Sequence, residues 1–199
     1  MVHIILVRHA QSMANLEGRW SGATEEELSP LGYEQTVMLT ERLRSVKIDR
    51  IYSSPMKRTR ETIFPVALSH GLEPIICDAL REANYGVFDG LTDEEMQRKY
   101  PDLYPIRKEY LNRNIIPGQE PYIEVQKRVV ACITKIAREN DGKTILISSH
   151  YDAIRSFLCF ILNIPFRDFP KYVNLYNIAI NEVMFDPRNN TFKIIQLSH

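Results

Sequence analysis

Residues 1–15 read MVHIILVRHAQSMAN and change from apolar to polar within a few positions. Five of the six residues between Met1 and Arg8 are apolar and most are β-branched, which predicts a buried β-strand over residues 2–7. Polarity then changes abruptly, because Arg8 and His9 come next and a loop of small and polar residues follows them. The strand therefore delivers a guanidinium group and an imidazole side by side at its carboxyl end.

Three further short apolar runs, at residues 50–54, 73–77 and 143–149, have the character of buried strands. Helical patterns separate them, and alternation of strand and helix is typical of an α/β fold with helices on both faces of a sheet. Residues 179–197 read as two strands around a PRNN turn. We therefore expect a three-layer α/β/α sandwich, with a mostly parallel central sheet and a C-terminal antiparallel hairpin at its edge.

Two of the expected helices carry clear start signals. Ser29 is placed to cap a helix in which Pro30 takes the first position, and Thr92 forms a capping box with Glu95. The apolar stripe expected along the first of these helices comprises Leu31, Met38, Leu39, Leu43 and Val46.

The length of 199 residues and the 44% hydrophobic content fit a globular chain of one large domain or two small ones. No linker, repeat or low-complexity segment divides the chain, so we expect a single domain over residues 1–199. Prolines are concentrated in the middle of the chain, and we expect residues 83–122 to form a lid or insert within this domain.

Charge and composition exclude several classes of function. Lys plus Arg and Asp plus Glu both number 25, so the formal net charge of +0 excludes the electrostatic footprint of a nucleic-acid binder. No apolar run approaches the ~20 residues of a membrane span, and we expect a cytoplasmic protein without a membrane partner. The cysteines, Cys77, Cys132 and Cys159, are odd in number and lack a CxxC spacing, which predicts neither a disulfide framework nor a zinc site.

Titratable residues follow each expected parallel strand. Because the carboxyl ends of parallel strands share one sheet edge, His9, Arg58, Glu82 and His150 are expected to meet there beside Arg8. Arginine forks match phosphate geometry, a neutral imidazole can attack phosphorus, and a carboxylic acid can protonate a leaving oxygen. No cluster of Asp and Glu and no HExxH spacing suggests a metal, so the residues indicate metal-free phosphoryl transfer.

Six motifs in order resemble those of the histidine phosphatase superfamily, also called the phosphoglycerate-mutase-like family. These are LVRHAQSMAN (6–15), LSPLGYEQ (28–35), SSPMKRTRET (53–62), LREANYGVFDGLTDEE (80–95), IPGQEPYIEVQKRV (116–129) and SSHYDAIR (148–155). The resemblance implies the phosphoglycerate-mutase-like fold. It also implies that His9 is the nucleophile and that Glu82 is the general acid and then the base. The residues implied to hold the phosphoryl group are Arg8, Asn15, Arg58 and His150.

The sequence departs from the family pattern at several positions. Ala10 and Tyr151 each stand where the family usually has a glycine after a histidine. Ser21 and Ala23 stand where relatives that bind sugar phosphates often have larger side chains, which argues against glycerate-phosphate chemistry. Glu120, in the GQEP loop, is a further candidate for the pocket.

The resemblance leads to a metal-independent phosphomonoester phosphatase that uses a phosphohistidine and no cofactor, acting on a small molecule. Only about 40 residues separate Glu82 from the helix expected near 121–140, and this short insert favours an open pocket and hydrolysis. The alternatives are a cofactor-dependent phosphoglycerate mutase, a specialised phosphatase for phosphoserine or α-ribazole phosphate, and a non-catalytic phospholigand-binding module. A homodimer through the C-terminal hairpin is left open. The aromatic residues that would either contact the substrate or pack a lid are Tyr85, Phe88, Tyr100, Tyr104 and Tyr110.

Overall fold

A computed structural model describes residues 1–105, 115–171 and 173–198, and these residues contain a six-stranded sheet. The strands are β1 (Val2–Arg8), β2 (Arg50–Ser53), β3 (Ile75–Ile76), β4 (Thr144–Ser149), β5 (Ile180–Asp186) and β6 (Thr191–Gln196). Their order across the sheet is β3-β2-β4-β1-β5-β6. The first four strands in this order run parallel. β5 pairs antiparallel with β1, and β6 pairs antiparallel with β5.

The sheet register aligns the strand ends that matter for the site. Arg8, the last residue of β1, is paired with Ser149, the last residue of β4. Ser53 at the end of β2 is paired with Ser148 on the other side of β4. The residues that follow these three strands therefore begin at one edge of the sheet, as the sequence predicts.

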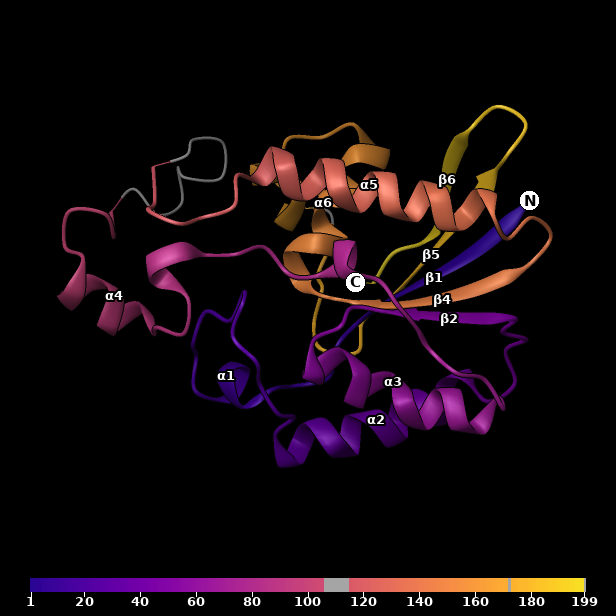
Figure 1. Cartoon of the computed structure of the whole chain (residues 1–199), viewed down its shortest axis with the longest axis horizontal. Coiled ribbons are helices and arrows are strands. Elements are labelled where there is room, and N and C mark those ends of the chain that lie inside the picture. The colour runs from indigo at the N-terminus through magenta and orange to yellow at the C-terminus, as the bar shows by residue number, and fades with distance from the viewer. Residues whose placement is uncertain (106–114, 172, 199) are drawn as a thin grey trace.

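Helices cover both faces of the sheet (Figure 1). The α-helices are α1 (Met13–Leu16), α2 (Pro30–Leu43), α3 (Lys57–Ser69), α4 (Asp93–Lys99), α5 (Tyr122–Arg138) and α6 (Tyr151–Leu162). Short 3₁₀ turns are η1 (Asp78–Leu80), η2 (Gly86–Phe88) and η4 (Phe166–Lys171). In Figure 1, α5 and α6 lie above the sheet and α2 and α3 lie below it.

Successive residues of β1 enter two different cores because side chains alternate across a strand. Ile4 and Leu6 pack in the core that includes residues of α5 and α6, whereas Ile5 and Val7 pack in the core that includes residues of α2 and α3. A strand buried on both faces explains why the sequence shows a continuous apolar run without alternation. The predicted three-layer α/β/α sandwich with its antiparallel hairpin is confirmed.

The start of α2 agrees with its sequence signals, but its expected apolar stripe is partly wrong. The Ser29 hydroxyl accepts a hydrogen bond from the backbone N–H of Gly32, and Pro30 occupies the first turn. Leu31 and Met38 are about half exposed, at 46% and 56%. The buried positions of α2 are Gly32, Thr36, Leu39 and Leu43.

Gly32 explains why the stripe is displaced. A Cβ atom built on this glycine would lie 2.1 Å from the backbone oxygen of Gln11, in the loop after β1. Close approach of two backbones therefore turns the Gly32 side of α2 toward the molecule and leaves Leu31 on the outside. Hydrophobicity alone does not reveal such a contact, because glycine contributes no apolar side chain.

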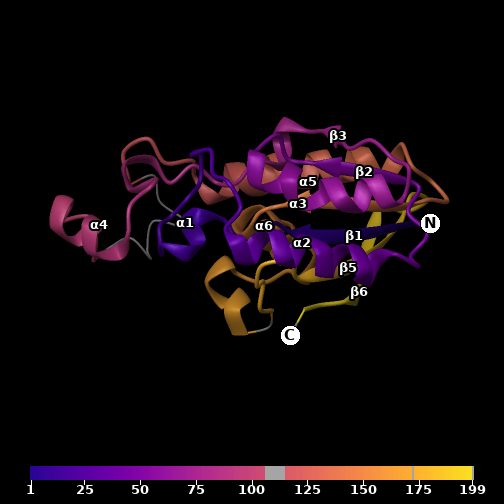
Figure 2. The same ribbon diagram turned by 90° about the horizontal axis from the view of Figure 1, so that it is seen from below.

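The chain leaves the sheet after η1, and the described residues 83–105 and 115–121 lie between η1 and α5. The capping box of Thr92 and Glu95 forms as expected at the start of α4. Figures 1 and 2 show α4 well beyond the strand ends, on the side of the sheet where α1 also lies. Part of the expected insert, residues 106–114 with Tyr110, lies outside the described residues.

This segment has a small core of its own, formed by Phe88, Met96 and Ile116. Partly buried aromatic residues pack against this core, among them Trp20, Tyr85, Tyr100 and Tyr104.

Within the described part of the chain, no helix has the length and apolar content to cross a membrane. The three cysteines are not joined in disulfides.

Candidate active site

The carboxyl end of β1 positions His9 with one ring nitrogen engaged. The side chain is buried, and its Nδ1 atom lies 2.7 Å from the backbone oxygen of Ala10. A carbonyl oxygen can only accept a hydrogen bond, so Nδ1 carries the proton and Nε2 keeps its lone pair. Burial and the charges of Arg58 and Arg8 hold the pKa of His9 well below its usual range. His9 is therefore a neutral imidazole at neutral pH, with Nε2 available as a nucleophile.

Ala10 fits its position without backbone strain. Its N–H donates to the Thr62 hydroxyl at 2.8 Å, and its side chain is fully buried. The non-glycine residues with positive φ in the described chain are Asn163, Ile178 and Asn190, so Ala10 does not adopt the conformation that favours glycine. Alanine is accepted here for that reason.

The guanidinium group of Arg8 contacts Leu175 and the ring of Tyr151. Its Nη1 donates to the backbone oxygen of Leu175 at 2.5 Å, and its guanidinium carbon lies 5.1 Å from the centre of the Tyr151 ring. The buried Nε atom has no hydrogen-bond partner among the described residues. Burial lowers the pKa of Arg8, but a guanidinium group keeps its proton in proteins. Arg8 thus holds an unused donor suited to an anion.

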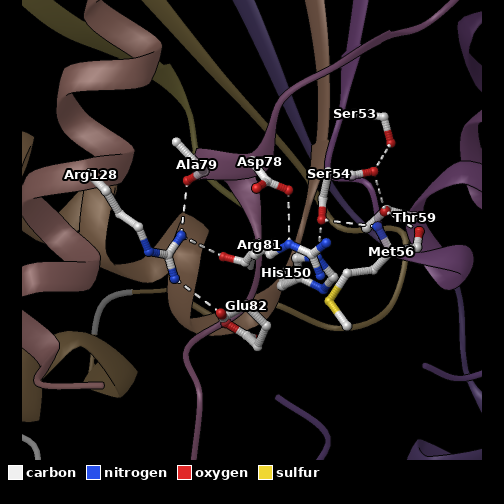
Figure 3. A network of polar contacts seen from close by, with 10 residues as sticks. All are labelled: Ser53, Ser54, Met56, Thr59, Asp78, Ala79, Arg81, Glu82, Arg128 and His150. Carbon is white, nitrogen blue, oxygen red and sulfur yellow. Dashed lines mark hydrogen bonds and ion pairs between the residues drawn. The ribbon is translucent and has the colours of Figure 1, made fainter. Parts of the chain in front are cut away.

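His150, which follows β4, lies next to His9. The two ring centres are 5.3 Å apart and meet edge to face. Arg58 Nε donates to His150 Nδ1 at 3.2 Å, so His150 carries its proton on Nε2. This Nε2 lies 2.8 Å from the Ser54 hydroxyl, and Figure 3 draws both of these residues. Burial and the charge of Arg58 keep the pKa of His150 well below its usual range. Both ring nitrogens are therefore occupied in this structure.

Arg58 is the second residue of α3 and is almost fully buried. Its two terminal nitrogens donate to the backbone oxygens of a single loop, those of Ser21, Gly22 and Thr24, at 2.8–3.2 Å. Burial lowers its pKa, yet the group remains a cation. Arg58 therefore joins three separate parts of the chain: α3, the loop at 21–24 and His150.

Glu82 is buried beside the start of α6. Its carboxylate accepts hydrogen bonds from the backbone N–H groups of Ala83, Asp152 and Ala153 at 3.0–3.2 Å. Burial, followed by the charge of Asp152, raises the pKa of Glu82 to about 7. A carboxyl group with that pKa can donate a proton at neutral pH and later accept one.

Asp152 is a second buried carboxyl group at this place. It accepts a hydrogen bond from the Tyr85 hydroxyl at 2.9 Å and pairs with Arg155 at 3.4 Å. These two partners stabilise its charged form, although burial raises its pKa. The two carboxyl groups therefore differ in environment, and Glu82 is the one suited to carry the proton.

A cavity of about 510 Å³ opens next to Glu82. Both apolar and charged or polar residues line it: Gly22, Ala23, Met56, Asp78, Ala79, Arg81, Glu82, Asn84, Glu120 and Arg128. Tyr85, Phe88, Tyr100 and Tyr104 are not among these residues and pack instead around the small core of the insert. For these four residues the structure shows packing in the insert, and the Tyr85 hydroxyl also reaches Asp152.

Arg128 of α5 braces the chain segment that carries Glu82 (Figure 3). It donates to the backbone oxygens of Ala79, Arg81 and Glu82 at 2.8–3.0 Å. It also forms a two-pronged ion pair with Glu120, at 2.7 and 2.8 Å. Glu120 thus lines the cavity as a partner of Arg128.

All six predicted site residues lie near the carboxyl edge of the parallel strands, with Asn15 on α1 immediately after the loop of His9. Sequence reasoning missed Thr62, Asp152 and Asn177, which contact these residues. Asp152 is within a quoted motif, SSHYDAIR, and its place two residues after His150 was the available signal. Asn177 has no local signal, because it meets His9 only through the tertiary fold.

The family of sequences described as the histidine phosphatase superfamily (branch 1) matches residues 4–197. The chain belongs to the histidine phosphatase superfamily. The prediction of a phosphatase of this family is confirmed, because the match covers nearly the whole chain. Among the described residues of this histidine phosphatase, no group of three or more His, Cys, Asp or Glu side chains is placed to hold a metal ion.

Individual relatives agree with this assignment. Phosphoserine phosphatase 1 of Hydrogenobacter thermophilus is 32% identical over 190 residues, which are 96% of this chain and 90% of the relative. A probable phosphoglycerate mutase of Shigella dysenteriae, GpmB, is 30% identical over 83% of this chain and 77% of its own length. The solved phosphoserine phosphatase of Entamoeba histolytica, in complex with 3-phosphoglyceric acid, superposes with a TM-score of 0.84 at 25% identity, over 100% of this chain and 98% of that one.

Proposed function

We propose that this histidine phosphatase hydrolyses small phosphomonoesters through a phosphohistidine at Nε2 of His9, without a metal or a cofactor. The observation that carries the proposal is the neutral, buried His9 with Nδ1 bonded to the Ala10 oxygen, beside two guanidinium groups. We also propose that residues 1–199 act as one domain, with 83–122 as an insert over the strand ends.

In the first step, the lone pair of His9 Nε2 attacks phosphorus and the bond from phosphorus to the alcohol oxygen breaks. The protonated Glu82 carboxyl donates its proton to that oxygen, so the product leaves as a neutral alcohol. In the second step, the Glu82 carboxylate takes a proton from water while the water oxygen attacks phosphorus. The P–N bond breaks, His9 becomes neutral again, and phosphate is released.

The phosphoryl group would be held by Arg8, Asn15, Arg58 and His150. Arg8 contributes the buried Nε donor that no described residue uses. His150 can contribute its Nε2 proton once a phosphate oxygen replaces the Ser54 hydroxyl as acceptor. Fixed cations and N–H groups of this kind stabilise the charge that builds up in the transition state.

We infer that the alcohol part of the substrate lies in the cavity next to Glu82, where a small charged group would find polar partners. Asp78, Arg81, Asn84 and the Arg128–Glu120 pair are the polar groups that such a substrate would meet. Phosphoserine fits this description, and relatives named for phosphoserine phosphatase activity make it the first substrate to test. α-Ribazole phosphate and glycerate phosphates are the next, the latter because of the similarity to GpmB.

The deciding experiment is hydrolysis of phosphoserine and of p-nitrophenyl phosphate in excess EDTA by the wild type, His9→Ala and the control His70→Ala. We expect the wild type and His70→Ala to be equally active, because His70 lies at the far end of α3, and His9→Ala to be inactive. Alkali quenching should trap phosphate on the wild-type protein and not on His9→Ala. Activity that survives in His9→Ala would overturn the proposed mechanism, and activity that appears only as interconversion of glycerate phosphates with added 2,3-bisphosphoglycerate would favour the mutase.

A further inference from the structure

Asn177 touches two proposed site residues at once. It lies in the loop between η4 and β5, and its Nδ2 group donates to the backbone oxygen of His9 and to Oδ1 of Asn15, both at 3.0 Å. These partners precede it by 168 and 162 residues in the sequence. One side-chain amide thus ties the loop before β5 to the segment that carries the nucleophile.

The rest of this loop is also fastened to the end of β1. Leu175 accepts the hydrogen bond from Arg8 Nη1, and the N–H of Ile178 donates to the Arg8 backbone oxygen at 3.1 Å. Ile178 has a φ of +56°, which is costly for a β-branched residue. A strained residue persists where surrounding contacts over-determine it, so the position of Asn177 is tightly held.

The contact with Asn15 fixes which way the Asn15 amide faces. Asn15 Oδ1 accepts from Asn177 and also from the backbone N–H of Ser12 at 3.3 Å. No described residue accepts a hydrogen bond from Asn15 Nδ2. An amide flipped by 180° would bring its NH₂ group against two donors, so Asn177 and Ser12 together keep Nδ2 on the other side, free for an acceptor.

We propose that Asn177 is a positioning residue that locks the Asn15 amide with its NH₂ group toward the bound phosphoryl group. The inference rests on the proposed function, in which Asn15 contacts phosphate. A fully ionised phosphate group has only acceptor oxygens. An Asn15 amide that has lost Asn177 can turn its carbonyl oxygen toward them or swing away from the site, and either movement weakens phosphate binding. Asn177 would then act on phosphate through Asn15, without touching phosphate itself.

A double-mutant cycle tests this coupling. The competitive inhibition constant of inorganic phosphate is measured for the wild type, Asn15→Ala, Asn177→Ala and the double variant, with Asn174→Ala as a control. The constant does not depend on the fraction of enzyme that is folded, so a merely structural loss leaves it unchanged. We expect Asn177→Ala to weaken phosphate binding by about tenfold in the wild type, equivalent to about 1.4 kcal/mol, and by less than about twofold when Asn15 is already alanine.

Asn174 is an exposed residue of the same loop whose backbone alone makes the contacts described, with Ser198, so Asn174→Ala should leave the constant unchanged. Equal weakening by Asn177→Ala in both backgrounds, or no weakening in either, overturns the inference. If Asn177→Ala does not fold, Asn177→Ser takes its place, because serine is too short to reach Asn15. Failure of the proposed function has a different signature: Asn15→Ala then binds phosphate as the wild type does, or the wild type itself is inactive.

Discussion

Glu82 and Asp152 illustrate how the chemistry of single residues depends on their immediate surroundings. Both side chains are carboxyl groups buried at the start of α6. Asp152 has a hydroxyl donor and an arginine to balance its charge, whereas Glu82 has backbone N–H groups and the repulsion of Asp152. Because of this difference, Asp152 is charged at neutral pH, whereas Glu82 can carry a proton.

The first prediction concerns pH. In the proposed mechanism the phosphorylation of His9 needs protonated Glu82, so kcat/KM should fall as pH rises through about 7, the pKa of Glu82. At low pH, kcat/KM should fall as the His9 ring becomes protonated, because the neutral ring is the proposed nucleophile. This fall should lie well below pH 6.5, since the pKa of His9 is lowered. Asp152→Asn removes a negative charge that favours the protonated form of Glu82, so the basic limb should move to lower pH.

The measurement is a pH profile of kcat/KM for wild type, Asp152→Asn and Asp186→Asn. Asp186 is a carboxylate of the C-terminal hairpin paired with Arg188, and its removal should leave the profile unchanged. A basic limb that stays in place in Asp152→Asn, or moves to higher pH, contradicts the assigned charge of Asp152.

At the scale of elements, α2 depends on a close backbone contact more than on an apolar stripe. The Gly32 backbone approaches Gln11, in the loop that follows His9 and Ala10. The same loop receives a hydrogen bond from the Ser29 backbone N–H, which donates to the Gln11 oxygen. The first turn of α2 thus supports the segment that carries His9.

The second prediction is that Gly32→Ala destabilises the protein, although alanine normally improves a helix by about 1 kcal/mol relative to glycine. The new Cβ would lie 2.1 Å from a backbone oxygen, and overpacking typically costs about 1–3 kcal/mol. Urea denaturation measures the change in the free energy of unfolding. Val37→Ala, at an exposed position of the same helix, is the control and should change it by less than about 0.5 kcal/mol. A more stable Gly32→Ala variant would show that the contact is relaxed in solution.

At the scale of the whole molecule, the site joins segments that are far apart in the sequence. The single side chain of Arg58 connects α3 with the loop at 21–24 and with His150 after β4. A bound phosphate would add contacts among the same segments. Its binding should therefore stabilise the complete fold and not one element of it.

The third prediction is that inorganic phosphate raises the melting temperature in EDTA, with about 2.7 kcal/mol of stabilisation at 100 times its Kd. Arg58→Leu should lose this response and also at least about 2 kcal/mol of stability without phosphate, because buried carbonyl oxygens lose their donors. Arg60→Leu, two residues along α3 and exposed, is the matched control and should behave as the wild type. Thermal denaturation with and without phosphate measures both effects, and an unchanged Arg58→Leu variant contradicts them.

The sequence was enough to predict the layers of the fold and which residues meet at the candidate site. The apolar run of β1, the cap at Ser29 and the capping box at Thr92 are local signals, and each depends on residues within a few positions. Parallel strands also share a carboxyl edge, so residues that follow them can be expected to meet. His9, Arg58, Glu82 and His150 were predictable together for this reason.

The hydrogen-bond partners and the pKa values of these residues depend on the tertiary structure. Three features depend on partners more than sixty residues away in the sequence. They are the raised pKa of Glu82, the hydrogen bonds of both His150 ring nitrogens and the hydrogen bond from Asn177 to the His9 backbone oxygen. The burial of Gly32 in place of Leu31 depends on a backbone contact that hydrophobicity cannot report. Desolvation and hydrogen bonds across the fold set these properties, and a linear pattern of residue types contains neither.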